Sequence, residues 1–444
     1  MPYNSLKKIY TGSIANSPNP NIFLSAGEAS GDHYGAQIIA ELSRRHPDAT
    51  FFGLGGREME TAGLDRIIRA EDVAHMGITE VIRHAPRVYN SYRRLVAAIR
   101  QRKPDAAILI DFPDVNFRLA RELKKINIPV IYFVSPQLWA WKRSRLRWVQ
   151  QRINRMMVIF PFEEKFYRAR GVDAKFVGHP LAELPLPTIS REEYAAKYMF
   201  ANRKDPQSIS HMSRQWVALL PGSRWKEVES NLPTMLEAAA TLGANYDFLI
   251  PVASTLDTQA ISNLVFQKIL PAIQWSKSSI TLVPDAREAL HHARASVVAS
   301  GTATVQAAVI GNPFVVVYRV SPLTFRLAKR LVQYPPEIWN PAQNHAQPDT
   351  DPNLPIAMAN LVAGRRIVPE LLQDRFTAEN VAAALRPLLD DTPDRARMIA
   401  DLADVRQALQ PPEKSGSIQQ VCDAVDALLP QNEPLGGPNP ATGV

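Results

Sequence analysis

Short apolar runs that alternate with helix-like patterns set the strongest limit on how this chain can fold. The runs occupy residues 21–26, 50–54, 106–110, 129–134, 155–160, 174–177, 217–220, 248–251, 280–283, 295–299 and 314–318. Most of them are rich in Val, Ile, Leu or Phe and are followed by Gly, Pro, Asp or Ser. Strands of parallel sheets are buried on both faces and are joined by helices, so this rhythm predicts an α/β protein with parallel sheets.

The length of 444 residues, 46% of them apolar, is enough for two domains that each bury a core. The strand–helix series stops at a proline-rich and then polar stretch and afterwards resumes. We therefore expect two Rossmann-like domains that face a cleft. The expected ranges are a flexible extension at 1–20, a first domain at 21–190, a linker at 191–214, a second domain at 215–385, C-terminal helices at 386–430 that pack back on the first domain, and a disordered tail at 431–444.

Cysteine content and hydropathy limit the compartment. The chain has one cysteine, Cys422, which excludes a disulfide framework and a cysteine zinc site and fits a reducing environment. The first 20 residues lack an apolar core of signal-peptide length, and no run of 18 apolar residues occurs in the sequence. These features predict a cytoplasmic protein.

Charge is distributed unevenly along the chain. Residues 1–180 contain 28 Lys and Arg against 17 Asp and Glu, a balance of +11, whereas the whole chain carries +8. The remainder is therefore slightly acidic, at −3. A basic first half indicates an acidic partner, and both nucleic acid and an anionic membrane surface fit at this point.

A glycine turn follows the run at 217–220. Gly222, Ser223 and Arg224 lead into a periodic helical pattern expected from about residue 227 to residue 242. The first N–H groups of a helix lack partners and lie at the positive end of its dipole, which stabilises a phosphate by roughly 0.3 to 2 kcal/mol. A guanidinium suits a diphosphate because it donates hydrogen bonds from a fixed plane. The stretch is thus a phosphate site or an ordinary turn with a solvated arginine.

A second glycine turn occurs in the same half of the chain. Ser300, Gly301 and Thr302 follow the run at 295–299 and precede a helix expected at 305–310. Gln306, in the first turn of that helix, is placed to hydrogen-bond a ribose hydroxyl. Two glycine turns that precede helix N-termini in one domain favour a ligand with a diphosphate over the alternative that the first turn is an ordinary one.

Acidic residues follow two of the runs in the first half. Glu28, Ser30 and Asp32 lie in a small-residue loop after the run at 21–26, where carboxylates bind hydroxyls or cap the next helix. Asp111 and Asp114 come directly after the run at 106–110, and ligands of open α/β sheets bind beyond such strand ends. Asp114 has an alternative role as a helix cap, so we expect Asp111 to be the general base.

Basic and aromatic residues form two surface candidates. One is a helical pattern with no acidic residue between Arg83 and Lys103, and its residues Arg87, Arg93, Arg94 and Arg100 favour contact with an anionic leaflet over a merely solvated face. The other contains Trp139, Trp141, Lys142 and Arg143, which we also assign to membrane contact. This second group is compatible with stacking on nucleobases, with an acyl-chain entrance, or with a packed helix whose outer face is wet.

The sequence offers no metal or dinucleotide signature. Asp349 and Asp351 have a spacing that can hold a metal, but they lie in a proline-rich loop without neighbouring ligands, so chance explains them better. The histidines show no metal-ligand spacing, and Glu58 stands where a dinucleotide fingerprint needs its third glycine. We assign no metal and no cofactor.

Taken together, these segments resemble the lipid-A-disaccharide synthase family from about residue 23 to residue 429. No single motif is specific, but the following occur in the family's order. They are Ser25-Ala-Gly-Glu-Ala-Ser-Gly-Asp32, Met76-Gly-Ile-Thr-Glu-Val81, Asp111-Phe-Pro-Asp-Val-Asn116, Ser135-Pro-Gln-Leu-Trp-Ala-Trp141, Gly178-His-Pro180, Leu220-Pro-Gly-Ser-Arg-Trp-Lys-Glu227, Ser300-Gly-Thr-Ala303 and Asn360-Leu-Val-Ala-Gly-Arg365.

The resemblance implies a glycosyltransferase-B fold, a peripheral position on the cytoplasmic side of the inner membrane, and no metal. It implies transfer from UDP-2,3-diacylglucosamine to the 6-hydroxyl of 2,3-diacylglucosamine 1-phosphate, which yields a β(1→6) disaccharide and UDP. It also leaves room for a homodimer and gives nucleic acid no role.

The residue roles implied by the resemblance agree with the reading above. Asp111 matches the family's essential aspartate, Glu28 its glycine-loop glutamate and Arg224 the arginine of its Pro-Gly-Ser-Arg turn, after which Glu227 follows. Asn360 matches the asparagine of its Ser-Leu-Pro-Asn motif, although Ala357-Met358-Ala359 precede it here after a longer loop. Gln306 replaces a usual glutamate and so lacks charge-assisted hydrogen bonding to ribose.

Two alternatives belong to other classes. A UDP-N-acetylglucosamine 2-epimerase would use the same fold without an acceptor or a membrane. A basic peripheral protein would bind nucleic acid through residues 139–155 without binding UDP.

Overall fold

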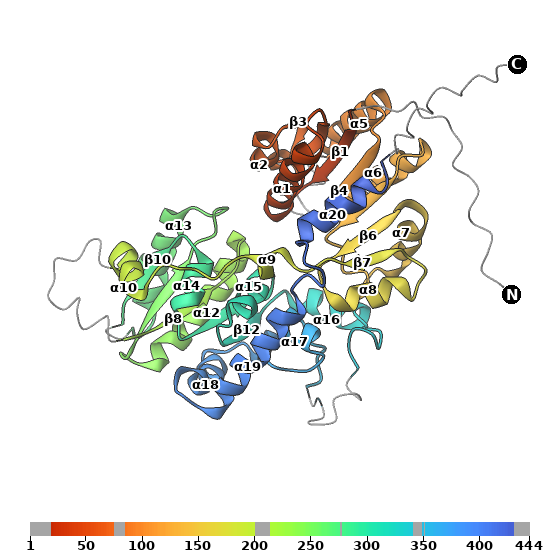
Figure 1. Cartoon of the computed structure of the whole chain (residues 1–444). Helices are drawn as coiled ribbons and strands as arrows, with labels where there is room; N and C mark the ends of the chain where they lie inside the picture. The colour runs from red at the N-terminus through yellow and green to blue at the C-terminus, as the bar shows by residue number, and fades with distance from the viewer. Residues whose placement is uncertain are drawn as a thin grey trace, which may run out of the picture.

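The computed structural model describes residues 19–74, 85–199, 214–275, 278–340, 349 and 351–429. Two parallel sheets, each with helices on both faces, make up the molecule (Figure 1). Every strand pair in both sheets is parallel, as the alternation of apolar runs and helices predicts. The expectations for residues 1–18, for the motif at 76–81 and for the tail at 431–444 fall outside the described residues.

Within the described residues, the first sheet has seven strands in the order β3-β2-β1-β4-β5-β6-β7. Its strands are β1 (Asn21–Ala26), β2 (Thr50–Gly55), β3 (Leu64–Arg69), β4 (Ala106–Ile110), β5 (Val130–Phe133), β6 (Arg155–Val158) and β7 (Ala174–Phe176). The helices are α1 (Ala29–Arg45), α2 (Arg57–Thr61), α3 (Glu71–Ala74), α5 (Ala85–Arg102), α6 (Pro113–Lys125), η1 (Arg143–Arg145), α7 (Leu146–Arg152), α8 (Pro161–Arg168) and α9 (Pro180–Glu183).

The second sheet has six strands in the described part of the chain, in the order β10-β9-β8-β11-β12-β13. They are β8 (Gln215–Leu220), β9 (Tyr246–Pro251), β10 (Ile280–Val283), β11 (Ala295–Ala299), β12 (Phe314–Tyr318) and β13 (Glu370–Leu372). The helices of this half are α10 (Arg191–Tyr194), η2 (Ala195–Met199), α12 (Trp225–Leu242), α13 (Thr258–Asn263), η3 (Leu264–Ile269), η4 (Leu270–Ala272), α14 (Ala286–His292), α15 (Thr302–Ile310), α16 (Pro322–Leu331), α17 (Met358–Ala363), η6 (Gln373–Arg375), α18 (Ala378–Leu389) and α19 (Pro393–Ala408).

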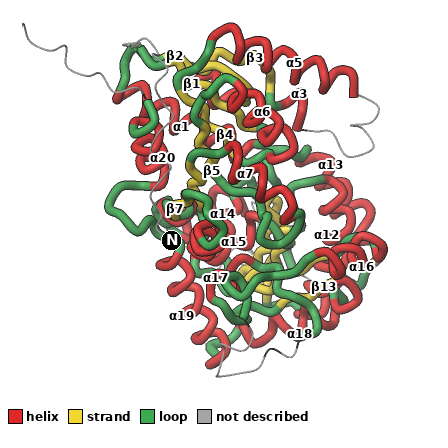
Figure 2. Tube along the Cα trace, turned by 90° about the vertical axis from the view of Figure 1, so that its right-hand side faces the viewer, coloured by secondary structure: helices red, strands yellow, loops and turns green. Residues whose placement is uncertain are grey.

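Burial of the central strands explains why they read as continuous apolar runs. All five residues of β4 and of β11 are buried, as is usual for strands covered on both faces. Figure 2 shows α1 and the last helix, α20 (Ser417–Asp426), on one side of the first sheet, with α5, α6 and α7 on the other. The register pairs Ala26 with Ile110 and Ile110 with Phe133, so the loops after β1, β4 and β5 lie side by side.

The C-terminal helices divide between the two domains. Helix α20 returns to the first domain as expected and packs on α1, where Arg45 forms ion pairs of 2.6 Å with Asp423 and 2.8 Å with Asp426. Cys422 lies buried in the same contact. Helix α19 packs instead on α15 and α17 of the second domain. None of the helices in the described ranges is long and apolar enough to cross a bilayer.

Candidate functional site

A hollow of about 220 Å³ opens at the carboxyl ends of the strands of the second sheet. It lies between the loops after β8, β9 and β11 and the first turns of α12 and α15. We call it the glycine-turn hollow because both predicted turns contribute to it. Its lining includes these predicted residues: Gly222, Ser223, Glu227, Ser300, Gly301, Thr302 and Gln306. The structure therefore brings together seven residues that the sequence placed in two separate motifs.

The first turn needs glycine for both conformation and space. Gly222 has φ +129°, a value that L side chains rarely adopt, and an added Cβ would lie 2.5 Å from Oε2 of Glu227. That carboxylate accepts a hydrogen bond of 3.1 Å from the N–H of Ser223. The hydroxyl of Thr255 donates to the carbonyl of Ser223 at 2.8 Å, which ties the turn to the neighbouring loop. The turn thus holds the N–H of Ser223 toward an anionic oxygen.

The second turn presents an open helix N-terminus. Gly301 has φ +153°, and an added Cβ would meet nothing within 4 Å. Its carbonyl accepts hydrogen bonds from the N–H and the hydroxyl of Thr304, which fix the turn before α15. Two helix N-termini therefore point into one hollow, an arrangement that favours an anionic ligand such as a diphosphate.

Arg224 is not among the residues that line this hollow, although its neighbour Ser223 and its partner Glu227 are. Its side chain is 72% exposed and its guanidinium forms a 3.1 Å ion pair with Glu227. An exposed pair of this kind contributes little to stability, so the guanidinium can turn to a ligand at small cost. The predicted role of Arg224 in binding stays a prediction.

Asp111 occupies a strained position at the end of β4. Asp111 and Phe112 have φ +45° and +47°, and such left-handed conformations cost about 1–3 kcal/mol each in residues with a side chain. The Asp111 carbonyl accepts hydrogen bonds from the Tyr132 hydroxyl and, at 2.8 Å, from the amide of Asn116. These two buried partners hold the turn in place, and strain maintained in this way is typical of functional positions.

The loop after β1 closes against the same turn. Glu28 is exposed at the N-cap of α1 and makes no side-chain capping bond. The ring of Phe112 lies over Gly27, where an added Cβ would be 2.4 Å from it. Burial, and to a smaller extent the nearby charge of Glu28, raise the pKa of Asp111 to about 6. The structure therefore unites the two predicted acidic residues at one sheet edge.

This coupling predicts a pH effect. If Asp111 is the predicted general base, it must be deprotonated to act, so turnover should be lost as the pH falls through about 6. Replacing Glu28 with glutamine removes a negative charge that stabilises the protonated form, so the acid limb of the kcat/KM profile should move to lower pH. The measurement is the pH profile of product release for both proteins. A limb that moves upward or stays in place would contradict the coupling of the two carboxyl groups.

Two predicted residues are engaged in structural contacts. Asp32 is buried, and its carboxylate accepts hydrogen bonds of 2.7–3.1 Å from three N–H groups at the start of α2, so it caps that helix and not its own. Asn360 is fully buried and bonds the backbone of Ile367 and Val368 and the carboxylate of Glu370. Both contacts indicate positioning; direct substrate binding by either residue stays a prediction.

Asp114 and Ser30 are exposed. Asp114 lies in the first turn of α6, 71% exposed, in a 2.8 Å ion pair with Arg145. Ser30 lies in the first turn of α1, close in sequence to Glu28. Neither residue is held by the core, so both remain available to a ligand.

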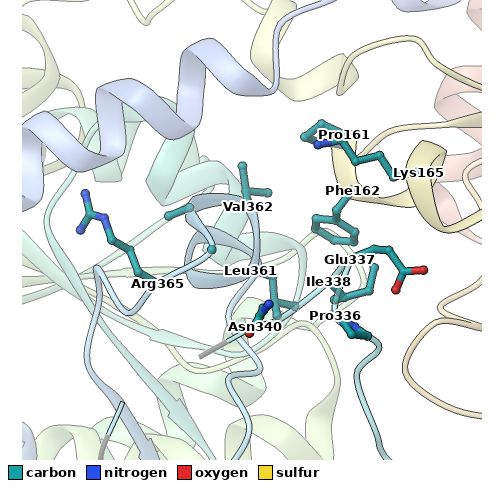
Figure 3. A pocket seen from close by; sticks show the side chains of 12 residues that line it. Pro161, Phe162, Lys165, Pro336, Glu337, Ile338, Asn340, Leu361, Val362 and Arg365 are labelled. Carbon is teal, nitrogen blue, oxygen red and sulfur yellow. The ribbon is translucent and has the colours of Figure 1, made fainter. Parts of the chain in front are cut away.

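A second hollow, of about 400 Å³, lies between the two domains and was not predicted. Figure 3 shows Phe162 and Lys165 of α8 across from Leu361 and Val362 of α17, with Arg365 at its end. Arg365 is held by Asp401 at 2.5 Å. The motif that begins at Asn360 could have indicated this hollow from the sequence, because the residues after Asn360 form one of its walls.

The prediction that Trp139 contacts a membrane is wrong. Its side chain is 1% exposed, its ring packs 5.3 Å from that of Phe162 and 5.5 Å from that of Tyr334, and its indole N–H donates to Glu163 at 3.1 Å. The apolar environment of this site raises the pKa of Glu163 to about 7. Because Ser135 also donates to Glu163, this buried carboxyl group positions the loop after β5.

The other predicted surface residues remain accessible. Trp141 is 45% exposed, and the ammonium of Lys142 lies 4.1 Å from its ring centre. Arg143 is exposed and donates to the carbonyl of Gln333 in the second domain. On α5, Arg93, Arg94 and Arg100 are exposed, whereas the side chain of Arg87 is outside the described residues.

Aspartates in the long loop are paired with arginines. Asp349 bonds Arg366 at 2.8 Å, and Asp351 bonds Arg375 at 2.5 Å. In the part of the chain that the structure describes, no group of three or more His, Cys, Asp or Glu residues could hold a metal ion.

Comparisons with known proteins identify relatives over nearly the full length. The model of a family described as lipid-A-disaccharide synthetase matches residues 22–425. The lipid-A-disaccharide synthase of Acidobacterium capsulatum is 52% identical over 424 residues, which cover 94% of this chain and 98% of that protein. That of Koribacter versatilis is 47% identical over 390 residues, 88% of this chain and 93% of the relative.

Solved structures share the architecture at low identity. The UDP-GlcNAc 2-epimerase from Neisseria meningitidis bound to UDP-GlcNAc aligns with a TM-score of 0.56 and 10% identity, over 92% of this chain and all of that one. The calicheamicin glycosyltransferase CalG4 aligns with a TM-score of 0.53 and 16% identity, over 94% and 100%. These likenesses concern the fold, and together with the two parallel sheets they confirm the glycosyltransferase-B arrangement.

Proposed function

Because this chain belongs to the lipid-A-disaccharide synthase family, and so is a glycosyltransferase, we propose that it transfers 2,3-diacylglucosamine from its UDP derivative to 2,3-diacylglucosamine 1-phosphate. The products are the β(1→6) disaccharide 1-phosphate and UDP. The glycine-turn hollow is the observation that carries the donor half of the proposal, because two helix N-termini and Gln306 line it. The diphosphate would lie at Ser223 and Gly301, and the ribose near Gln306.

The mechanism is an inverting displacement. The 6-hydroxyl oxygen of the acceptor attacks the anomeric carbon while the bond from that carbon to the UDP oxygen breaks on the opposite face. The hydroxyl proton passes to the Asp111 carboxylate. A pKa of about 6 leaves this base mostly ionised at neutral pH and still basic enough to take a proton as the new bond forms.

Charge that develops on the departing UDP is stabilised by the second domain. The N–H of Ser223 and the N-terminus of α15 would face it, and Arg224 would rotate from Glu227 to the diphosphate. In the structure the carboxylate of Glu227 accepts the hydrogen bond from the N–H of Ser223. A bound diphosphate would therefore compete with this carboxylate for that N–H.

The basic first half would hold the acceptor phosphate and an anionic membrane surface. Trp141, Lys142 and Arg143, with the arginines of α5, are the residues for this contact. We place the protein on the cytoplasmic face of the inner membrane because both substrates carry acyl chains. A homodimer is compatible with this arrangement.

The proposal is tested by UDP release from the purified protein. UDP-2,3-diacylglucosamine is supplied alone, with 2,3-diacylglucosamine 1-phosphate, or with the acceptor that lacks its phosphate. Release should require both lipids and should fall without the acceptor phosphate. Conversion of free UDP-N-acetylglucosamine without an acceptor would favour the epimerase alternative, and RNA binding without UDP binding would favour the nucleic-acid alternative.

A further inference from the structure

Helix α16 (Pro322–Leu331) has an apolar face that no other part of the described structure covers. No residue of this helix is buried. Leu323, Leu327 and Leu331 are 75%, 56% and 56% exposed, and their spacing of four places them on one side of the helix. Leu323 is the most exposed large apolar side chain among the described residues. A contiguous face of this kind marks a contact surface, whereas single exposed leucines do not.

The flanking charges specify the kind of partner. Arg326, Lys329 and Arg330 are all exposed on α16. No acidic residue occurs from Arg319 to Pro336, and none of the three cations forms an ion pair within the described residues. A helix with leucines on one face and uncompensated cations beside them is typical of segments that lie in the plane of an anionic bilayer.

The end of α16 connects to the surface already proposed for the first domain. The N–H of Gln333 donates to the carbonyl of Ala140 at 3.2 Å, and Arg143 donates to the carbonyl of Gln333. Gln333 is two residues after Leu331, and its partner Ala140 directly precedes Trp141. The end of α16 therefore lies close to Trp141. The exposed ring of Trp141, with Lys142 stacked on it, continues the basic and apolar character of α16 across the domain boundary.

We propose that α16 and residues 141–143 form one membrane-contact surface, with the three leucines inserted among the acyl chains of anionic phospholipids and the cations at the headgroups. A second copy of this chain is the weaker occupant, because a symmetric contact would bring the cations of two α16 helices face to face. The inference extends the proposed function, since it concerns how the two domains of the transferase meet the bilayer that holds both substrates.

The test is flotation of the full chain with vesicles of phosphatidylglycerol and phosphatidylethanolamine. The variant Leu323→Ser/Leu327→Ser/Leu331→Ser should reduce the vesicle-bound fraction at least tenfold, because it removes the apolar contacts that insert. The control Phe266→Ser/Ile399→Ser removes two apolar side chains of 44% and 40% exposure on η3 and α19 and should bind like the wild type. Wild-type binding should weaken on phosphatidylcholine vesicles.

Two further measurements separate this inference from the reaction. UDP release with both lipids in nonionic micelles should stay within about twofold of wild type in the leucine variant. If wild type floats as expected but releases no UDP, the proposed reaction fails and the surface stands. Unchanged flotation of the leucine variant would overturn the surface. Loss of flotation together with a halved mass by light scattering would also overturn it, because the leucines would then cover a second copy.

Discussion

Replacing Asp111 with asparagine is expected to lower the rate of UDP release by about 10²- to 10⁴-fold with both lipid substrates present. Asparagine keeps the size of the side chain but cannot take the proton from the acceptor hydroxyl. Burial already disfavours the ionised carboxylate, as its raised pKa of about 6 indicates, so the neutral amide should not lower the thermal stability. The measurement is the initial rate at neutral pH, with the melting temperature recorded for the same sample.

Asp114→Asn is the matched control for this experiment. Asp114 is three residues further along the same segment, but it is 71% exposed and paired with Arg145. Its variant should keep the rate within a few-fold of wild type. An Asp111→Asn enzyme within tenfold of wild type would reject Asp111 as the base, and a large loss in the control would move the base to Asp114.

Gly222→Ala is expected to weaken UDP binding by about 10- to 100-fold. The substitution forces a Cβ into a backbone with φ +129° and within 2.5 Å of the Glu227 carboxylate that faces the turn. The N–H groups of the turn would then no longer point at the diphosphate. A loss of one to two factors of ten in affinity corresponds to about 1.4 to 2.8 kcal/mol. Calorimetric titration with UDP measures the effect directly, without acceptor or membrane.

Gly243→Ala separates this local effect from general strain. Gly243 lies at the other end of α12 and has φ +87°, but an added Cβ there meets nothing within 4 Å. Both variants should lose stability, whereas only Gly222→Ala should lose UDP affinity. Equal losses of affinity in the two variants would show that the glycine turn has no specific part in binding the nucleotide.

Most of the fold could be predicted because its central strands are buried on both faces. Five strands, including β1, β4 and β12, begin and end where the apolar runs do. Two of the four edge strands, β3 and β13, were missed for a physical reason. In β3 the outer residues Asp65 and Arg69 are exposed, so its apolar pattern is interrupted, and β13 has only three residues. An edge strand is covered on fewer sides and leaves a weaker hydrophobic signal.

Part of the candidate site could likewise be predicted from the sequence, and part could not. Turn residues such as Gly222 and Gly301 could be predicted because the backbone itself forms the site after a recognisable strand. Trp139, Asp32 and Asn360 could not be assigned, since a polar or aromatic side chain looks the same in a sequence whether it faces solvent or a buried partner. Only the contacts of Trp139 with Glu163 and of Asp32 with the start of α2 decide that question.

The return of α20 to the first domain determines how the two halves can move. The chain crosses between the domains once after β7 and once again between α19 and α20, and the crossings touch, since the N–H of His179 donates to the carbonyl of Leu409 at 2.8 Å. Gly178, at φ +89°, lets Pro411 approach its backbone. Domain rotations are absorbed by a few residues in loops or at the ends of elements, and we expect these two adjoining crossings to serve as that hinge. Rotation about this hinge would carry the two glycine turns of the second domain toward Asp111 or away from it, which would admit substrate and release product.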